Sequence, residues 1–207
     1  GDRLVTGVQT CALPILLSMG ELFARFTEVA ATNPFAYYGA RRTALELATV
    51  TPENRLICFP YPKWMNAMDA VNQGAAVVMT SVGKARELGI DPAKWVFLHG
   101  CGEANEKILV SERVDYHSSP AMAANTSSAF EMAGKRIDDM DYIDIYSCFP
   151  SAVEIGCDEL GLRYDDPRGL TVTGGLPFFG GPGNNYSMHA IATMRSEEHT
   201  SELQSQA

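Results

Sequence analysis

One turn of the chain carries the residues best suited to chemistry. Cys148 lies within residues 147–149, and a cysteine thiol acts as a nucleophile or as an acid, depending on how its surroundings shift its pKa. Residues 142–146 alternate bulky apolar side chains with a carboxylate, which predicts a buried strand, and Pro150 suits the first turn of a helix. Open α/β sheets place their sites at such turns. The alternative is that Cys148 is a small buried side chain, since free cysteine is among the most buried residue types.

A second stretch, residues 173–189, predicts a place for negative charge. Its first eleven residues hold five glycines and two prolines, and Asn184, Asn185 and an apolar helical run follow. Glycine lets the backbone approach a ligand closely, and a helix that begins at such a loop points its positive end at an anion. The spacing matches neither a P-loop nor a dinucleotide fingerprint. The sequence favours an oxyanion site and leaves open a purely structural glycine turn.

Taken in this order, the two stretches resemble the C-terminal half of a thiolase, over residues 20–194. The resemblance is closest to the sterol-carrier-type branch and its thiolase-like relatives, often labelled acetyl-CoA acetyltransferases. A strand in that branch ends in a His-Asp-Cys-Phe turn, and the matching positions here are Tyr146, Ser147, Cys148 and Phe149. The branch continues with Gly-Gly-Leu leading to Gly-His-Pro, and the matching positions are residues 174–176 followed by Gly180, Gly181 and Pro182.

Two departures from the family pattern bear on the chemistry. In thiolases the Gly-His-Pro histidine helps to activate the nucleophile and to stabilise a thioester oxyanion, and this chain has Gly181 in its place. Tyr146 stands where the family completes that oxyanion hole. Because glycine carries no proton, two interpretations remain. Either the backbone N–H groups and polar side chains of residues 180–186 do the electrostatic work, or thiolysis is lost while an acyl-CoA pocket remains.

The resemblance implies an acyl-CoA acyltransferase of the acetyl-CoA acetyltransferase type. Such an enzyme forms or cleaves a carbon–carbon bond next to a CoA thioester, in lipid or sterol side-chain metabolism. In thiolases a separate cysteine, outside the part matched here, takes the acyl group, so Cys148 is expected as an acid/base or as a pocket wall. Two alternatives stay open: a retro-aldolase that uses Tyr146 and Tyr186 beside a small OB-fold partner, and a non-catalytic acyl-CoA-binding homologue.

The predicted site residues fall into two groups. Those expected in catalysis are Cys148, Tyr146, Asn184, Asn185 and Tyr186. Those expected to contact the substrate are Phe149, Gly180, Gly181, Pro182 and His189. Lys63 and Trp64 lie in the region matching the thiolase loop domain over the CoA cleft; they are either CoA contacts or, as is commoner, packing under a loop. The CoA thioester is a substrate, and no cofactor is expected.

Composition narrows the class of partner. A net charge of −9 argues against nucleic acid or an anionic membrane, and no run of eighteen apolar residues predicts a membrane span. The five cysteines show no CxxC spacing, which suits a reducing cytoplasm and argues against zinc held by His99, Cys101, Cys148 and Cys157. The resemblance implies a homodimer for the intact protein.

The two ends resemble translated sequencing-adapter sequence. They are VTGVQTCALPI at residues 5–15 and RSEEHTSELQS at residues 195–205. We interpret residues 1–15 and 195–207 as artefacts and expect the natural protein to be longer at both ends. Between them we expect a loop-domain and N-terminal-half remnant over residues 16–70 and a truncated C-terminal core over residues 71–194.

The resemblance also implies the fold class: α/β, a fragment of the thiolase fold with a layered α-β-α core, mostly its C-terminal half with part of the loop domain. The expected helices cover residues 19–32, 37–47, 81–88 and 121–134, with a further one from residue 150. The expected buried strands are residues 75–80, 95–99 and 142–146. A sheet edge and an apolar helix face are expected to lie uncovered.

Overall fold

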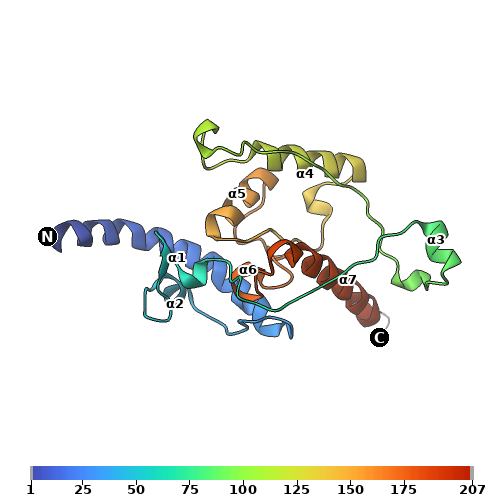
Figure 1. Cartoon of the computed structure of the whole chain (residues 1–207), viewed down its shortest axis with the longest axis horizontal. Coiled ribbons are helices and arrows are strands. Elements are labelled where there is room, and N and C mark those ends of the chain that lie inside the picture. Colours follow the sequence, from blue (N-terminus) through green and yellow to red (C-terminus); the bar gives the residue numbers. More distant parts are fainter. Residues whose placement is uncertain (1, 206–207) are drawn as a thin grey trace.

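The computed structural model describes the backbone of residues 2–205 and the side chains of residues 14–195. Its elements are α1 (Asp2–Thr32), α2 (Ala44–Ala48), β1 (Leu56–Cys58), β2 (Tyr61–Pro62), η1 (Lys63–Met65), α3 (Val82–Glu87), η2 (Pro92–Lys94), η3 (Val110–Glu112), α4 (Pro120–Ala133), η4 (Ile137–Asp139), α5 (Pro150–Leu160), α6 (Gly175–Phe178), η5 (Gly183–Asn185) and α7 (Tyr186–Ser205). Figure 1 shows α5, α6 and α7 in the body of the molecule, and α3 on a long loop at the end opposite the N-terminus.

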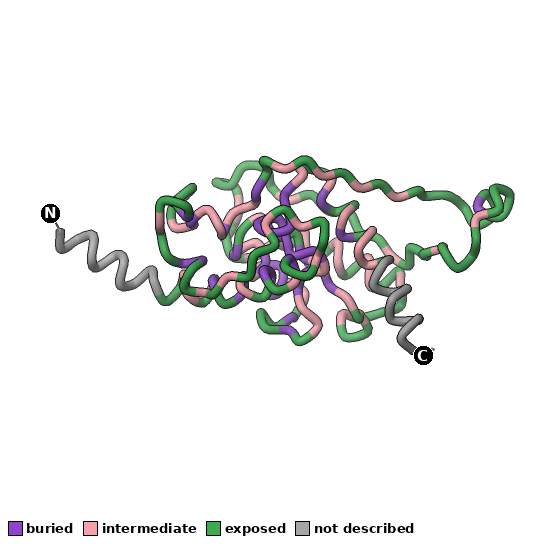
Figure 2. Tube along the Cα trace, turned by 90° about the horizontal axis from the view of Figure 1, so that it is seen from below, coloured by how far each residue is buried: buried purple, intermediate pink, exposed green. Residues whose placement is uncertain are grey.

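The core forms where α1 meets α6. Leu22, Phe23 and Phe26 are buried on one face of α1, as the helical spacing predicts, whereas Val29 is only partly buried. The Phe23 ring lies 5.2 Å from that of Phe26 and 6.0 Å from that of Phe178 in α6. Figure 2 shows the buried residues gathered in the middle of the trace. Burying one such side chain stabilises a fold by about 1.5–3 kcal/mol, so this cluster anchors α1 to the glycine-rich segment.

The second helix is shorter than the sequence indicated. A helix was expected over residues 37–47, but α2 begins only after Thr43. Thr43 Oγ1 accepts the N–H of Glu46 at 3.2 Å, and the Glu46 carboxylate accepts the N–H of Thr43 at 2.7 Å. This reciprocal capping box sets the start of the helix.

The residues before that cap are held by the core instead. The N–H groups of Tyr37 and Tyr38 donate to the carbonyls of Phe179 and Phe178, at 2.8 and 2.9 Å. These two bonds take the place of helical ones, and they draw the chain against the end of α6.

β1 and β2 form an antiparallel hairpin in which Leu56 pairs with Pro62. The buried side chain of Asn54 supports this hairpin. Its Nδ2 donates to the Leu47 carbonyl at 3.0 Å, and its Oδ1 accepts the N–H of Trp64 at 2.8 Å. One side chain thereby joins the end of α2 to η1, because an amide both donates and accepts.

Two segments expected to be buried strands have no strand structure. Residues 75–80 and 95–99 pair with no strand in the described part of the chain, and Val78 and Leu98 are 87% and 73% exposed. They flank α3 on the long loop that projects from the body in both views (Figures 1 and 2). A strand needs a neighbour about 4.8 Å away, and neither segment has one, so the prediction was wrong for both.

The third predicted strand, residues 142–146, is not a strand in the structure either, so this prediction was also wrong, although the alternation of buried side chains is kept. In residues 142–146 the side chains of Ile143 and Ile145 are buried, as a strand facing a core requires. The N–H of Ile145 donates to the Leu170 carbonyl at 3.0 Å. The segment therefore runs beside residues 170–173 as extended chain.

The helices around these segments match the sequence pattern closely. α3, α4 and α5 fill the predicted ranges, and α5 begins at Pro150. α4 and α5 end at Gly134 and Gly161, whose φ values of 62° and 67° lie in the left-handed region that favours glycine.

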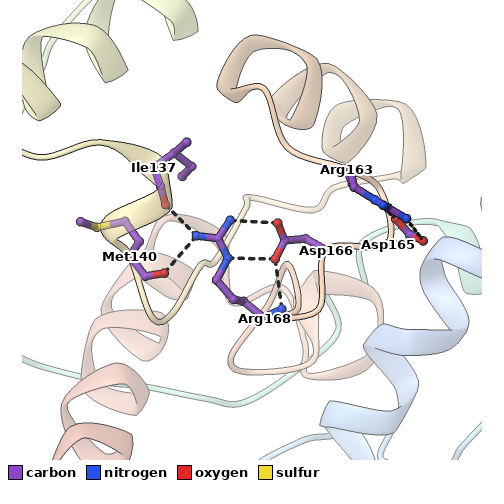
Figure 3. A network of polar contacts seen from close by, with 6 residues as sticks. All are labelled: Ile137, Met140, Arg163, Asp165, Asp166 and Arg168. Carbon is purple, nitrogen blue, oxygen red and sulfur yellow. Dashed lines mark hydrogen bonds and ion pairs between the residues drawn. The ribbon is translucent and has the colours of Figure 1, made fainter.

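Arg168 fastens the loop between α5 and α6. Its Nε and Nη2 donate to the Asp166 carboxylate at 2.9 and 2.8 Å, and its Nη1 donates to the carbonyls of Ile137 and Met140 at 2.6 and 3.0 Å (Figure 3). One guanidinium thus holds η4 against the chain that leads to residue 170.

The segments interpreted as adapter sequence lie largely outside the described side chains. The backbone of residues 2–15 belongs to α1, and that of residues 195–205 to α7. The adapter interpretation and the boundary between residues 70 and 71 rest on the sequence and stay predictions.

Candidate functional site

Two bends meet inside the molecule: the thiol bend, residues 146–149, and the glycine bend, residues 174–182. The N–H of Leu176 donates to Ser147 Oγ at 3.2 Å, and both residues are buried. A buried donor and a buried acceptor therefore satisfy one another across the two bends. Their meeting, on which the interpretation of the sequence depends, is present in the structure.

A third segment crosses both bends and holds them in register. The N–H of Ala67 donates to the Cys148 carbonyl at 2.8 Å, and that of Met68 to the Leu176 carbonyl at 3.2 Å. The N–H of Gly181 then donates to the Met68 carbonyl at 2.8 Å. These backbone bonds bring the end of η1 to both bends.

The Cys148 side chain is half-buried between them. It packs against the buried cluster that Leu176, Phe179 and Tyr186 form. Burial raises the pKa of the Cys148 thiol, because an apolar environment disfavours the thiolate. The thiol therefore stays protonated at neutral pH, which suits proton donation better than nucleophilic attack.

A cavity of about 870 Å³ opens beside Cys148 and Phe149. Its wall also includes Arg55, Lys63 and Trp64, so the thiol, an aromatic face and two cations share one space. The volume lies within the roughly 300–1,000 Å³ of small-molecule and cofactor sites. The sequence had singled out all of these residues except Arg55.

Two cations lie over the Trp64 ring. The guanidinium carbon of Arg42 lies 3.7 Å from the ring centre, and Lys63 Nζ lies 5.0 Å from it. Such contacts order the Trp64 and Lys63 side chains at the cavity wall, while Arg42 lies outside the lining. Glu53 and Asp69 line the same cavity, so its charge is mixed.

The hairpin fixes the position of Phe149. The rings of Tyr61 and Phe149 stack with centroids 5.7 Å apart and planes 18° apart, and the Tyr61 hydroxyl donates to Ser151 Oγ at 2.9 Å. β2 therefore braces the start of α5.

The two candidate tyrosines meet edge to face but differ in access to solvent. Tyr146 is 45% exposed, and its ring lies 5.5 Å from that of Tyr186, which is 1% exposed. The Tyr186 hydroxyl lies 2.7 Å from Thr173 Oγ1 and donates to Asp144 Oδ2 at 3.3 Å. Burial raises the pKa of both phenols, so neither is a ready base at neutral pH.

Several donors proposed for an oxyanion are engaged within the protein. The Asn185 side chain accepts the N–H of Ala75 at 2.7 Å and donates to its carbonyl at 3.0 Å, and the N–H of Asn185 donates to Pro182. Gly181 donates to Met68, while Asn184 lies exposed in η5. In this arrangement Asn185 and Gly181 hold the loop together. The role of both asparagines and of Gly181 toward a substrate stays a prediction.

The glycines of this bend are tightly enclosed. Gly180 has a φ of 128°, and a Cβ there would stand 2.3 Å from Gln73 Oε1. A Cβ on Gly181 would stand 3.3 Å from the Met68 carbonyl oxygen and 3.6 Å from Ala67 Cβ. A side chain at position 181 would thus begin beside the segment that bridges the bends.

His189 belongs to a different space. It lines a second cavity of about 820 Å³, together with Tyr142, Arg168 and Phe179. Its ring lies 5.1 Å from that of Phe179, and burial lowers the pKa of the imidazole. His189 and Cys148 therefore line separate cavities.

One comparison with known proteins decides the family. A solved structure of a monomeric SCP2-thiolase-like protein type 1 from Mycobacterium smegmatis matches this chain with 50% sequence identity and a TM-score of 0.83. The match covers 90% of this chain and 41% of that one. The chain belongs to the thiolase superfamily, in its sterol-carrier-type branch.

The fold is a fragment of the α/β thiolase fold, since this chain spans 41% of the length of its solved relative. No family model and no curated protein matches. Among the described residues, no cluster of three or more His, Cys, Asp or Glu side chains lies close enough to hold a metal ion. No described helix combines the length and apolar character that crossing a membrane requires.

Within this thiolase-like frame, the sequence interpretation named Tyr186 but missed the polar groups that its hydroxyl joins. Asp144, Thr171, Thr173 and Tyr186 form a connected set of hydrogen bonds beneath the two bends. A carboxylate inside an apolar run was the available signal, because a buried charge needs donors from elsewhere in the fold. The Thr-Val-Thr stretch before the glycine pair supplies them.

Proposed function

We propose that the protein to which this chain belongs is a thiolase-like acyltransferase that forms or cleaves a carbon–carbon bond next to a CoA thioester. The observation that carries the proposal is the cavity in which Cys148 and Phe149 share a wall with Lys63, Arg55 and Trp64. The thiol bend and a pair of cations share one cavity of about 870 Å³. The bend suits the acyl end of a ligand, and the cations suit its phosphate end. We further propose that this chemistry serves lipid or sterol side-chain metabolism.

In this proposal the thioester lies at the thiol bend and the phosphates of CoA lie near the two cations. Cys148 acts as a proton donor or as a pocket wall, because its raised pKa keeps the thiol protonated. Gly181 offers no proton, so the group that the family's histidine supplies must come from elsewhere or be absent. A non-catalytic acyl-CoA-binding protein would keep the same cavity.

A retro-aldolase is the second candidate, and the exposure of Tyr146 favours it. That phenol lies two residues before Cys148 in the thiol bend and is 45% exposed, so a substrate can reach it. Tyr186 is a weaker candidate, because its hydroxyl is committed to Thr173 and Asp144. A small OB-fold partner belongs to this alternative.

Calorimetry on the chain tests the ligand class. Acetoacetyl-CoA is expected to bind the unmodified chain, and Lys63→Ala and Arg55→Ala are each expected to weaken binding roughly tenfold by removing a charge-assisted phosphate contact. Lys135→Ala is the matched control, since this lysine is exposed and outside the cavity. Absence of heat with acetoacetyl-CoA, or equal losses in all three variants, would contradict the proposal.

Assays of the intact protein separate the reactions. Cleavage of acetoacetyl-CoA that requires free CoA identifies thiolysis, whereas cleavage of a β-hydroxyacyl-CoA without free CoA identifies retro-aldol chemistry. Binding without either product identifies the non-catalytic homologue.

For assembly, we propose a monomer in place of the expected homodimer, because the similar mycobacterial protein is described as monomeric. A cytoplasmic location remains part of the proposal. Light scattering on the intact protein tests the assembly state.

A further inference from the structure

Asp144 is the acceptor at which several donors converge. Its Oδ2 accepts Thr171 Oγ1 at 3.0 Å, the N–H of Val172 at 3.0 Å and the Tyr186 hydroxyl at 3.3 Å. An ionised carboxylate only accepts hydrogen bonds, so both hydroxyls must point their protons toward it. Asp144 therefore sets the orientation of the hydroxyl groups around it.

That orientation reaches the backbone of the glycine bend. Because the Thr171 hydroxyl donates its hydrogen bond to Asp144, its oxygen is free to accept the N–H of Gly174, at 3.1 Å. Thr173 Oγ1, whose proton then points to the Tyr186 oxygen, accepts the N–H of Gly175 at 3.1 Å. The N–H groups of Gly174 and Gly175 are thus hydrogen-bonded to hydroxyls whose orientation Asp144 sets.

The same carboxylate acts on the thiol bend indirectly, through Tyr186. The Tyr186 ring, held in place through its hydroxyl, lies 5.5 Å from the Tyr146 ring, and it belongs to the buried cluster against which Cys148 packs. We propose that Asp144 is a positioning residue, which through Tyr186 and the two threonines sets how closely the thiol bend and the glycine bend enclose Cys148. The inference deepens the proposed acyl-CoA site and rests on that function for its biological meaning, but its geometry stands without a ligand.

The network is poised to respond to pH. Burial raises the pKa of the Asp144 carboxyl to about 6, although hydrogen bonds from Val172, Thr171 and Tyr186 work in the opposite direction. Tyr186 is the titratable group that faces it from a neighbouring element, and its raised pKa keeps it protonated. The main causes of the shift include no lysine or arginine of the described chain. Protonation of Asp144 weakens the hydroxyl bonds it accepts, because charge-assisted bonds are the stronger ones.

The test is the pH profile of Cys148 alkylation by iodoacetamide, followed by peptide mass spectrometry so that the other cysteines do not interfere. The measured rate is divided by the fraction of Cys148 present as thiolate at each pH. We expect this corrected rate in the unmodified chain to rise roughly fivefold as the pH falls through about 6, because a charge-assisted hydrogen bond is lost. Asp144→Asn keeps the size of the side chain and is expected to show the faster rate without the inflection. Asp138→Asn, at an exposed carboxylate, is the matched control and is expected to keep the profile.

An inflection that persists in Asp144→Asn, or a profile without one in the unmodified chain, overturns the inference. The second condition needs no variant, so a failure of Asp144→Asn to fold leaves the inference testable. Tyr186→Phe, which deletes only the hydroxyl, is expected to shrink the inflection. Because alkylation needs no acyl-CoA, an inflection without acetoacetyl-CoA binding refutes the proposed function alone, and binding without an inflection refutes this inference alone.

Discussion

At the scale of single residues, Ser147 joins the two bends through one buried hydroxyl. Ser147→Ala leaves the Leu176 N–H buried without its acceptor, so we expect the free energy of unfolding to fall by about 1–3 kcal/mol. Urea unfolding measures the change. Ser128→Ala is the control, since that hydroxyl is exposed on α4, and it is expected to change stability by less than about 0.5 kcal/mol. Equal effects of the two substitutions would contradict a bridging role for Ser147.

A second residue-scale prediction concerns acid stability. The Arg168 guanidinium holds the pKa of Asp166 at about 2, below the value of about 3.9 for an unperturbed aspartate. The stability that this pair contributes is therefore present above about pH 4 and is lost as the pH falls toward 2. Asp166→Asn is expected to destabilise the chain near neutral pH and to have little effect once Asp166 itself is protonated.

The exposed pair beside it supplies the comparison. The side chains of Arg163 and Asp165 are 78% and 49% exposed, against 23% and 10% for Arg168 and Asp166. Asp165→Asn should therefore change unfolding little at either pH, because solvent screens exposed pairs. A pH-independent loss in Asp166→Asn would show that packing, and not the charge, accounts for its effect.

How far the sequence predicted the site also depends on the residue. Cys148, Phe149, Lys63 and Trp64 were singled out from their neighbours along the chain, and the structure places all four at one cavity. Asn185 looked equally suited to a ligand, but its amide binds Ala75, 110 positions earlier in the chain. Local pattern shows which polar groups exist, while the long-range fold decides which of them are already satisfied.

At the scale of elements, the glycine bend packs directly on α1. Gly174 has a φ of 108°, and a Cβ there would stand 2.5 Å from Ala30 Cβ. Gly174→Ala must therefore push α1 away, and we expect a loss of at least about 3 kcal/mol from backbone strain and overpacking together. Gly183→Ala is the matched control, because its φ is also positive at 57° but nothing stands within 4 Å.

The expected loss in Gly183→Ala is about 1 kcal/mol, the cost of the left-handed backbone alone. Thermal or urea unfolding of both variants isolates the contact with α1. Similar stabilities for the two variants would mean that the bend does not press on α1 in solution.

Helices were predicted better than strands, for a physical reason visible in particular elements. α4 and α5 carry their own start and stop signals, Pro at the first turn and glycine after the last, so local sequence suffices. Residues 75–80 have the apolar run of a buried strand, but a strand is defined by a partner that the run does not contain. The expected helix over residues 37–47 failed similarly, because Tyr37 and Tyr38 bind the carboxyl end of α6.

At the scale of the whole molecule, the chain has a thiolase-like body and an exposed loop. We call this loop, residues 75–99, the apolar excursion, because it carries the two exposed apolar segments on either side of α3. The body holds both bends, both cavities and the core around α1. The loop around α3 is largely exposed along its trace (Figure 2), and its apolar side chains include Val78 and Leu98, which are 87% and 73% exposed. This chain spans 41% of the length of its solved relative. Exposed apolar extended segments offer unpaired backbone groups to other chains, so the excursion is where self-association is expected to begin.

The double substitution Val78→Lys and Leu98→Lys tests that expectation. Because these side chains are 87% and 73% exposed, their replacement should leave the free energy of unfolding within about 0.5 kcal/mol while it lowers light scattering at high protein concentration. The control places the same two charges at the exposed polar positions Asn72 and Asn105, which changes the net charge equally but removes no apolar surface. A drop in scattering for the control as well would assign the effect to charge alone. A large loss of stability in the Val78 and Leu98 variant would show that both side chains are packed in solution, and the excursion would then be part of the core.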